Sequence, residues 1–309
     1  MTQETLVKSF SIPTYDESLV HLDAERRALW HYLNPAPRPV FTHKVLSEIL
    51  DLQEQVKLHL NAVGHVSPEI QYLILASAIP RTFSLGGDLE LFANLIRTRD
   101  REHLTAYARL CIECVYNNTS SVGSPYLTTI SLVQGSALGG GFEAGLSTNI
   151  LVAERSAQLG LPEILFNLFP GMGAYNLLAR RLDPARAERF LRSGRQYSAA
   201  ELYEMGVVDV LAEDGEGVHA VNTFIRRHQR SQNGLLAIQQ VRQRLNPIPF
   251  KELEDVVSIW VDAAMRLKER DLRTMERLVS AQHRLARRNE DMGRPHEPAD
   301  NLVTLAGVA

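Results

Sequence analysis

The sequence has no excess of positive charge and no long apolar run. Its 309 residues carry a formal net charge of -3 at pH 7, so a basic surface for nucleic acid is not expected. No stretch approaches the roughly 18 uninterrupted apolar residues of a membrane-spanning helix. The first residues are polar and lack the apolar core of a secretion signal. These absences predict a cytoplasmic protein with no nucleic-acid partner and no membrane insertion.

Cysteine is also scarce, since only Cys111 and Cys114 occur. A redox C-x-x-C motif lies where a strand meets a helix, but this pair lies inside a segment with helical apolar spacing. A single pair supplies half the ligands of a structural zinc ion, and the ten histidines are scattered without a suitable pairing. We therefore expect no metal site, and a buried structural role for both thiols.

Strand and helix patterns alternate through the first two thirds of the chain. Residues 43–63 have helical apolar spacing, and residues 70–78 form a continuous apolar run typical of a buried parallel strand. A further strand is predicted at 126–134 and a helix at 140–147, whereas 214–289 is helical throughout. The pattern predicts an α/β core over residues 1–213, a helical region over 214–290 and a flexible tail over 291–309. The late helices either pack on a neighbouring subunit or fold back onto their own core.

Two glycine-rich turns each follow a predicted strand and precede a helix. The first contains Gly86 and Gly87, and the second contains Gly139, Gly140 and Gly141. A glycine inside a helix lowers helix stability by about 0.5–1 kcal/mol relative to alanine. A run of three glycines is therefore expected only where another backbone segment or a ligand must come close to the chain. The start of a helix offers unpaired amides and the positive end of the helix dipole. Two such amides can converge on one oxygen as an oxyanion hole.

Two glutamates follow the glycines. Glu143 lies three residues beyond Gly140, on the same helix face, and Glu163 follows Pro162, which stiffens the turn before it. Two carboxyl groups beside a polarised carbonyl suit removal of an α-proton and protonation of a leaving group. Each feature also has a purely structural explanation, because Glu143 complements a helix dipole and Glu163 caps a helix. A dinucleotide fingerprint is excluded, since Ala144 stands where its third glycine is required.

Taken in order, three segments resemble the crotonase (enoyl-CoA hydratase/isomerase) superfamily: FSLGGDLELF (83–92), the segment 133–182 with its glycine turn, and YSAAELYEMGVVDVL (197–211). The resemblance implies an α/β crotonase-like spiral of ββα units, with a C-terminal helical region that covers the pocket and makes oligomer contacts. It implies oxyanion amides at Gly87 and Gly140 and an acid–base pair at Glu143 and Glu163. Many relatives lack one or both acids, so their joint presence implies the addition or removal of water.

Within the superfamily, the flanking residues most resemble the diffusible signal factor (DSF) synthases of bacterial quorum sensing. This rests on SLGGDLELF (84–92), LGLPEILFNLFPGMGAY (159–175) and the long helical C-terminus. It implies a dehydratase and thioesterase that converts 3-hydroxyacyl-acyl carrier protein to the cis-2-enoyl form and releases a free unsaturated fatty acid. It also implies no cofactor besides the carrier's phosphopantetheine, a homotrimer or dimer of trimers, and a cognate receptor or sensor kinase. An enoyl-CoA hydratase acting on free CoA thioesters and a non-catalytic binding module remain as alternatives.

A long acyl chain needs an apolar pocket, for which the resemblance and the apolar runs suggest wall residues. The candidates, besides Gly86 in the first turn, are Phe169, Met172, Trp260 and Leu278. Burial in the core or in a subunit interface explains each of them as well. Arg81, just before the first glycine turn, is a candidate contact for a phosphate or a phosphopantetheine arm, although an exposed, solvated arginine is the simpler interpretation.

Overall fold

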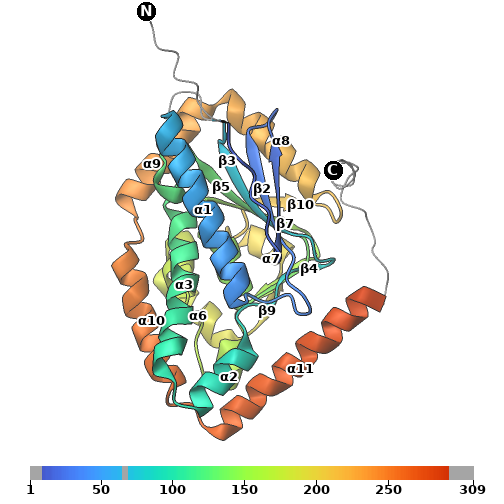
Figure 1. Cartoon of the computed structure of the whole chain (residues 1–309), viewed down its shortest axis with the longest axis vertical. Coiled ribbons are helices and arrows are strands. Elements are labelled where there is room, and N and C mark those ends of the chain that lie inside the picture. Colours follow the sequence, from blue (N-terminus) through green and yellow to red (C-terminus); the bar gives the residue numbers. More distant parts are fainter. Residues whose placement is uncertain (1–8, 65–68, 292–309) are drawn as a thin grey trace, which may run out of the picture.

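The computed structural model describes residues 9–64 and 69–291 (Figure 1). The first part of the chain forms β1 (Ser18–Asp23), β2 (Ala28–Leu33), α1 (His43–Val63), β3 (Tyr72–Ser77), β4 (Thr82–Ser84), α2 (Leu89–Arg97), α3 (Arg101–Thr119), η1 (Ser121–Gly123), β5 (Thr128–Val133), β6 (Ser136–Leu138), α4 (Gly140–Ser147), β7 (Ile150–Glu154) and β8 (Gln158–Gly160). It continues with η2 (Glu163–Phe166), α5 (Ala174–Arg181), α6 (Pro184–Ser193), β9 (Gln196–Ser198), α7 (Ala199–Glu204), β10 (Val210–Ala212), α8 (Gly217–Arg230), α9 (Gln232–Leu245), α10 (Phe250–Ala264) and α11 (Glu269–Asp291). The predicted flexible tail begins at Asp291, the last residue of α11, and the rest of it, 292–309, lies outside the described residues.

The strands form two sheets that the chain builds in alternation. The larger sheet has the order β1-β2-β3-β5-β7-β10 and is parallel except for the β1–β2 pair. The smaller has the order β4-β6-β8-β9 and is parallel except for the β8–β9 pair. Each turn of the chain adds one strand to each sheet before a helix, as in β3-β4-α2, β5-β6-α4 and β7-β8-η2. The predicted spiral of ββα units is confirmed.

Helices cover both faces of the larger sheet (Figure 1). Successive strand residues point to opposite faces. Leu29 and Leu73 therefore pack in one cluster with Leu52 of α1. Their neighbours Trp30 and Ile74 belong instead to a cluster with side chains of α8. Because both faces are buried, the central strand β3 is mostly apolar, which is why the run at 70–78 predicted a strand.

Five strands of the described structure show no clear strand pattern in the sequence. Four of them, β4, β6, β8 and β9, are three residues long, which is too short for an alternating pattern to emerge. The fifth, β1, is mostly half-exposed and mixes polar and apolar side chains. The short strands form the smaller sheet, and two of them, β4 and β6, lead directly into the glycine-rich turns. The sequence therefore indicated the turns but missed the sheet that carries them.

The four helices after residue 214 confirm the helical pattern of this region. In this chain they fold back onto their own core, since α10 packs against α3, and α11 packs beside α2 and η2 (Figure 1). Arg97 of α2 forms an ion pair with Glu269 of α11 at 2.9 Å and joins the two helices at the surface.

None of the helices in the described ranges has both the length and the apolarity that a bilayer crossing requires.

Candidate active site

The two glycine-rich turns meet at the start of α4. A Cβ placed on Gly140 would lie 3.3 Å from the Gly87 nitrogen, so the two turns are in close contact. Gly140 is the first residue of α4, and its N–H therefore has no acceptor one helical turn earlier. Both glycines line the same pocket. Their backbone groups are thus available to a ligand in that pocket.

The other glycines of the second turn are required by the crowding around it. Gly139 has φ 53°, a conformation that residues with a side chain rarely adopt. A Cβ there would also lie 2.5 Å from Oε1 of Glu163. A Cβ on Gly141 would overlap the carbonyl oxygen of Ser84 in β4. The glycine run therefore lets β4, α4 and the Glu163 carboxyl group approach one another.

Glu143 projects from α4 and is held by the backbone of a neighbouring loop. Its Oε1 accepts hydrogen bonds from the amides of Met172 at 2.8 Å and Ala174 at 3.0 Å. The side chain is buried, and this burial raises the pKa of Glu143 to about 7, although the two amides act in the opposite direction. Glu143 therefore titrates near neutral pH in a fixed position.

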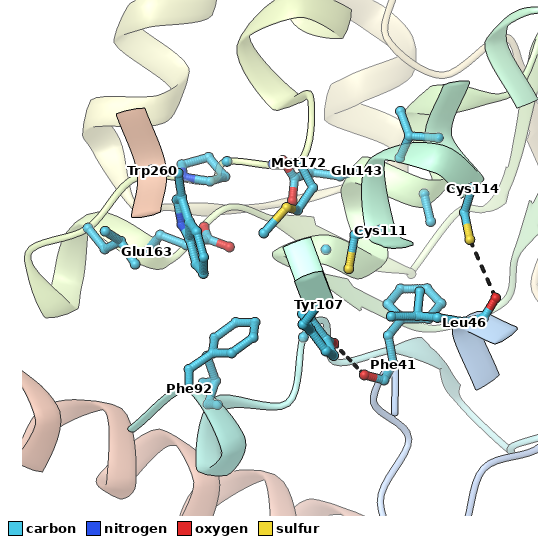
Figure 2. Close-up of a pocket in the computed structure, with 18 of the residues that line it drawn as sticks. Phe41, Leu46, Phe92, Tyr107, Cys111, Cys114, Glu143, Glu163, Met172 and Trp260 are labelled. Atoms are coloured by element: carbon cyan, nitrogen blue, oxygen red, sulfur yellow. Dashed lines mark hydrogen bonds between the residues drawn. The ribbon is translucent and has the colours of Figure 1, made fainter. Parts of the chain in front are cut away.

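Glu163 begins the short helix η2, directly after Pro162. Its Oε2 is shielded from solvent and has no hydrogen-bond partner among the described residues. Burial, followed by the negative charge of Glu143, raises the pKa of Glu163 to about 8. Figure 2 shows this carboxyl group beside Trp260, with Glu143 behind Met172. The two glutamates thus influence each other and share one apolar environment.

The pocket around the glutamates is narrow and mostly apolar, with a cavity volume of about 70 Å³. One wall is aromatic: the ring of Phe92 is edge-on to Trp260 at 5.3 Å and to Tyr107 at 5.1 Å between ring centroids. Trp260 comes from α10 and packs so closely on Gly171 that a side chain there would collide with it. Further lining residues include Phe41, Leu46, Ile49, Cys111, Phe166 and Leu168. This wall suits an apolar chain attached to a polar reacting group.

Comparison with known proteins identifies the family. Residues 55–283 match the family model described as enoyl-CoA hydratase/isomerase. The chain belongs to this family.

Among curated proteins, the chain is 32% identical over 171 residues to "Probable enoyl-CoA hydratase echA8" of Mycobacterium leprae, covering 54% of this chain and 62% of that protein. It is 31% identical over 141 residues to "Methylglutaconyl-CoA hydratase 1, mitochondrial" of Pyricularia oryzae, covering 46% of this chain and 38% of that protein. The chain thus spans less than two thirds of the length of each of these relatives.

Solved structures with the hydratase/isomerase fold resemble nearly the whole chain. An enoyl-CoA hydratase/isomerase from Xanthobacter autotrophicus Py2 matches with a TM-score of 0.69 and 19% identity, over 92% of this chain and 100% of that one. DspI of Pseudomonas aeruginosa matches with a TM-score of 0.62 and 23% identity, over 82% of this chain and 98% of that one. At these identities the likeness shows the fold alone.

The structure brings most of the predicted site residues of this family member together. Gly87, Gly140, Glu143 and Glu163 line one pocket, as do Met172 and Trp260. Their roles in catalysis and substrate binding stay predictions.

Four other candidates do not line this pocket in the part of the chain that the structure describes. Gly86 lies one residue behind Gly87 and turns its carbonyl toward the Phe41 amide. Phe169 and Leu278 are half-buried and pack against the main core cluster. Arg81 is exposed.

The side of the pocket that α3 supplies was not predicted from the sequence. Tyr107 and Cys111 lie one helical turn apart on this helix, and both line the pocket. Cys111 is half-buried on the pocket wall, and Cys114, which also lines the pocket, is buried with its sulfur 3.7 Å from the carbonyl oxygen of Leu46. Burial raises the pKa of both thiols, so they remain protonated and weakly nucleophilic. The i, i+4 spacing of Tyr107 and Cys111 was the available signal for a shared helix face, but the local sequence does not say what that face contacts.

Proposed function

We propose that this protein removes water from a 3-hydroxyacyl thioester to form a 2-enoyl thioester, and then hydrolyses the thioester to release a free unsaturated fatty acid. The observation that carries the proposal is the pair Glu143 and Glu163, both with raised pKa, in one apolar pocket beside Gly87 and Gly140. Membership of the hydratase/isomerase family supports a thioester as the reacting group.

In the first step, the thioester oxygen lies between the amides of Gly87 and Gly140. One ionised glutamate takes the C2 proton, and negative charge develops on that oxygen, where the amides stabilise it. The electron pair then forms the C2–C3 double bond as the C3–O bond breaks. The other glutamate donates its proton to the departing hydroxyl, which leaves as water. The raised pKa of both groups supports a pair that keeps one proton near neutral pH.

In the second step, water adds to the thioester carbonyl carbon. A glutamate accepts a proton from this water, and the negative charge of the tetrahedral intermediate uses the same amides. The C–S bond then breaks, and the glutamate passes the proton that it took from the water to the departing sulfur, which leaves as a thiol. One apolar pocket with one pair of amides therefore serves both reactions.

Acyl carrier protein is the proposed carrier, with its phosphopantetheine arm as part of the substrate. Arg38, beside the first glycine turn, pairs with Asp88 and Glu90, each at 3.2 Å. Because two carboxylates already neutralise this cation, it is a poor binding group for the phosphates of free CoA. The alternative, a hydratase acting on free CoA thioesters, is favoured by the family description and by the names of the curated relatives.

A homotrimer or a dimer of trimers is part of the same proposal. Helix α9 exposes Ile238, Val241 and Leu245, whose spacing of three to four residues places them on one face. An exposed apolar stripe of this kind supports contact with another subunit. The cognate receptor or sensor kinase stays a prediction.

The proposal is tested by incubating the purified protein with 3-hydroxydodecanoyl-acyl carrier protein and, separately, with the same acyl group on CoA. Mass spectrometry of the products should show free 2-dodecenoic acid from the carrier-protein substrate. Reversible loss of water from the CoA substrate to give 2-dodecenoyl-CoA, without any free acid, would instead favour the hydratase. If neither thioester is converted, the non-catalytic binding module becomes the better explanation.

The two raised pKa values predict a bell-shaped pH profile. We expect kcat/KM for dehydration to be greatest between the pKa of about 7 for Glu143 and that of about 8 for Glu163. Below the lower value both carboxyl groups are protonated and no base remains, whereas above the upper value both are ionised and no acid remains. Because the groups are coupled, the two limbs report the pair. Steady-state rates across this range provide the measurement, and a profile that stays level through both values would contradict the acid–base pairing.

A further inference from the structure

The Gly87 amide belongs to the peptide group between Gly86 and Gly87, and the backbone of Phe41 binds the carbonyl side of that group. The Phe41 N–H donates a hydrogen bond to the carbonyl oxygen of Gly86 at 2.8 Å, and Phe41 pairs with Gly87 in an isolated parallel bridge. A trans peptide is planar, and its N–H and C=O point in opposite directions. Since the Gly86 carbonyl points to Phe41, the Gly87 N–H points away from it.

The next peptide group is held by Tyr107 of α3. The Asp88 N–H donates to the Tyr107 hydroxyl at 3.3 Å, and that hydroxyl donates in turn to the carbonyl oxygen of Phe41 (Figure 2). The peptide groups before and after Gly87 are therefore both tied to Phe41, one directly and one through Tyr107. The three contacts form a closed frame around Gly87.

Gly87 depends on this frame because it has no side chain to restrict its backbone. The frame itself is rigid, since Tyr107 is buried and its ring packs edge-on against Phe92 at 5.1 Å. Phe92 also fills the space where a Gly87 side chain would lie. Burial raises the pKa of Tyr107 well above its usual value, so its hydroxyl remains a donor throughout the working pH range.

We infer that Tyr107 is a positioning residue that keeps the Gly87 N–H aimed at the thioester oxygen, acting through Asp88 and the Phe41 backbone. The inference rests on the proposed thioester function, because it assigns Gly87 an oxyanion to stabilise. It adds a residue from the α3 side of the pocket to the two turns and the two glutamates.

Tyr107→Phe removes the hydroxyl and little else. The Asp88 N–H then loses the Tyr107 hydroxyl as an acceptor, and the Phe41 carbonyl loses the same hydroxyl as a donor, so the turn is held less firmly. We expect kcat to fall about tenfold, which is less than the 10²–10³-fold loss when an oxyanion donor is removed outright. KM should change little, because the apolar wall is intact. Replacement of Tyr107 by 4-aminophenylalanine, which keeps a donor and an acceptor at the same point, should restore part of kcat.

The matched control is Tyr116→Phe on the same helix. The ring of Tyr116 packs against Phe250 with centroids 5.4 Å apart, and Tyr116 does not line this pocket in the described structure. A direct readout is the infrared stretching frequency of a carbonyl labelled with carbon-13 in bound 2-dodecenoyl-pantetheine. This is measured in a Glu163→Gln background that blocks turnover. A polarised carbonyl absorbs at lower frequency, so Tyr107→Phe should return the band toward its position in free ligand, and Tyr116→Phe should not.

The outcomes separate this inference from the function on which it rests. If the protein with Tyr107 intact converts thioesters, and Tyr107→Phe leaves both kcat and the carbonyl band unchanged, the positioning role is wrong and the function stands. A variant that loses only thermal stability, with the band still shifted in its folded fraction, also overturns the role. If the protein with Tyr107 intact neither converts a thioester nor shifts the band, the proposed function fails and the inference fails with it.

Discussion

Glu163→Gln is expected to lower kcat for dehydration by about 10²–10⁴-fold, the usual contribution of a general acid or base. The amide keeps the shape of the side chain but cannot exchange a proton. Oε2 of Glu163 has no hydrogen-bond partner among the described residues, so the substitution breaks no contact there. Glu143→Gln should have an effect of similar size. Its amide oxygen can still accept from the amides of Met172 and Ala174, so the loop should stay in place.

The measurement is the rate at which the ultraviolet absorption of the enoyl thioester appears under saturating substrate. Glu188→Gln is the matched control, because Glu188 is an exposed glutamate on α6, outside the pocket. Thermal unfolding of all three variants checks that the fold is retained. Wild-type kcat in either pocket variant would show that the corresponding carboxyl group takes no part in proton transfer.

Gly140→Ala is expected to reduce kcat by about 10²–10³-fold while the protein remains folded, in line with the loss of an oxyanion donor. The φ of Gly140 is not in the left-handed region, so alanine fits the backbone. Its methyl group would lie 3.3 Å from the Gly87 nitrogen, where we expect the thioester oxygen to bind. The thioester oxygen could then no longer reach both donors. Steady-state kinetics with the same thioester measures the effect.

Gly145→Ala provides the control on the same helix. Its methyl group would make an ordinary contact with Leu151 at 3.4 Å, on the side that packs against the sheet. Activity should be retained, and the free energy of unfolding should rise by about 0.5–1 kcal/mol because alanine favours the helix. If Gly140→Ala is as active as Gly145→Ala, the oxygen does not bind between the turns.

Features that depend on neighbouring residues in the chain were predictable from the sequence. The α4 helix at 140–147 and the α6 helix, which begins after the Asp183 cap with Pro184 at its first position, depend on local spacing and capping. The glycine turns were recognisable because each lies between a predicted buried strand and a helical pattern. The resemblance to a known family then suggested which glycines and glutamates form the site, and the structure brings Gly87, Gly140, Glu143 and Glu163 to one pocket.

Features that depend on distant residues were decided by the tertiary structure alone. The pKa of Glu163 rises because the fold buries it beside Glu143, and no spacing of twenty residues encodes that environment. Tyr107 meets Asp88 and Phe41 because α3 packs against the first turn, and Trp260 reaches the pocket because α10 folds back onto α3. Periodicity says which face of a helix is apolar, but it does not say which surface that face will cover. The sequence by itself therefore determined which glycines and glutamates are candidates for the site, and only the folded chain determined their protonation, their orientation and the wall that surrounds them.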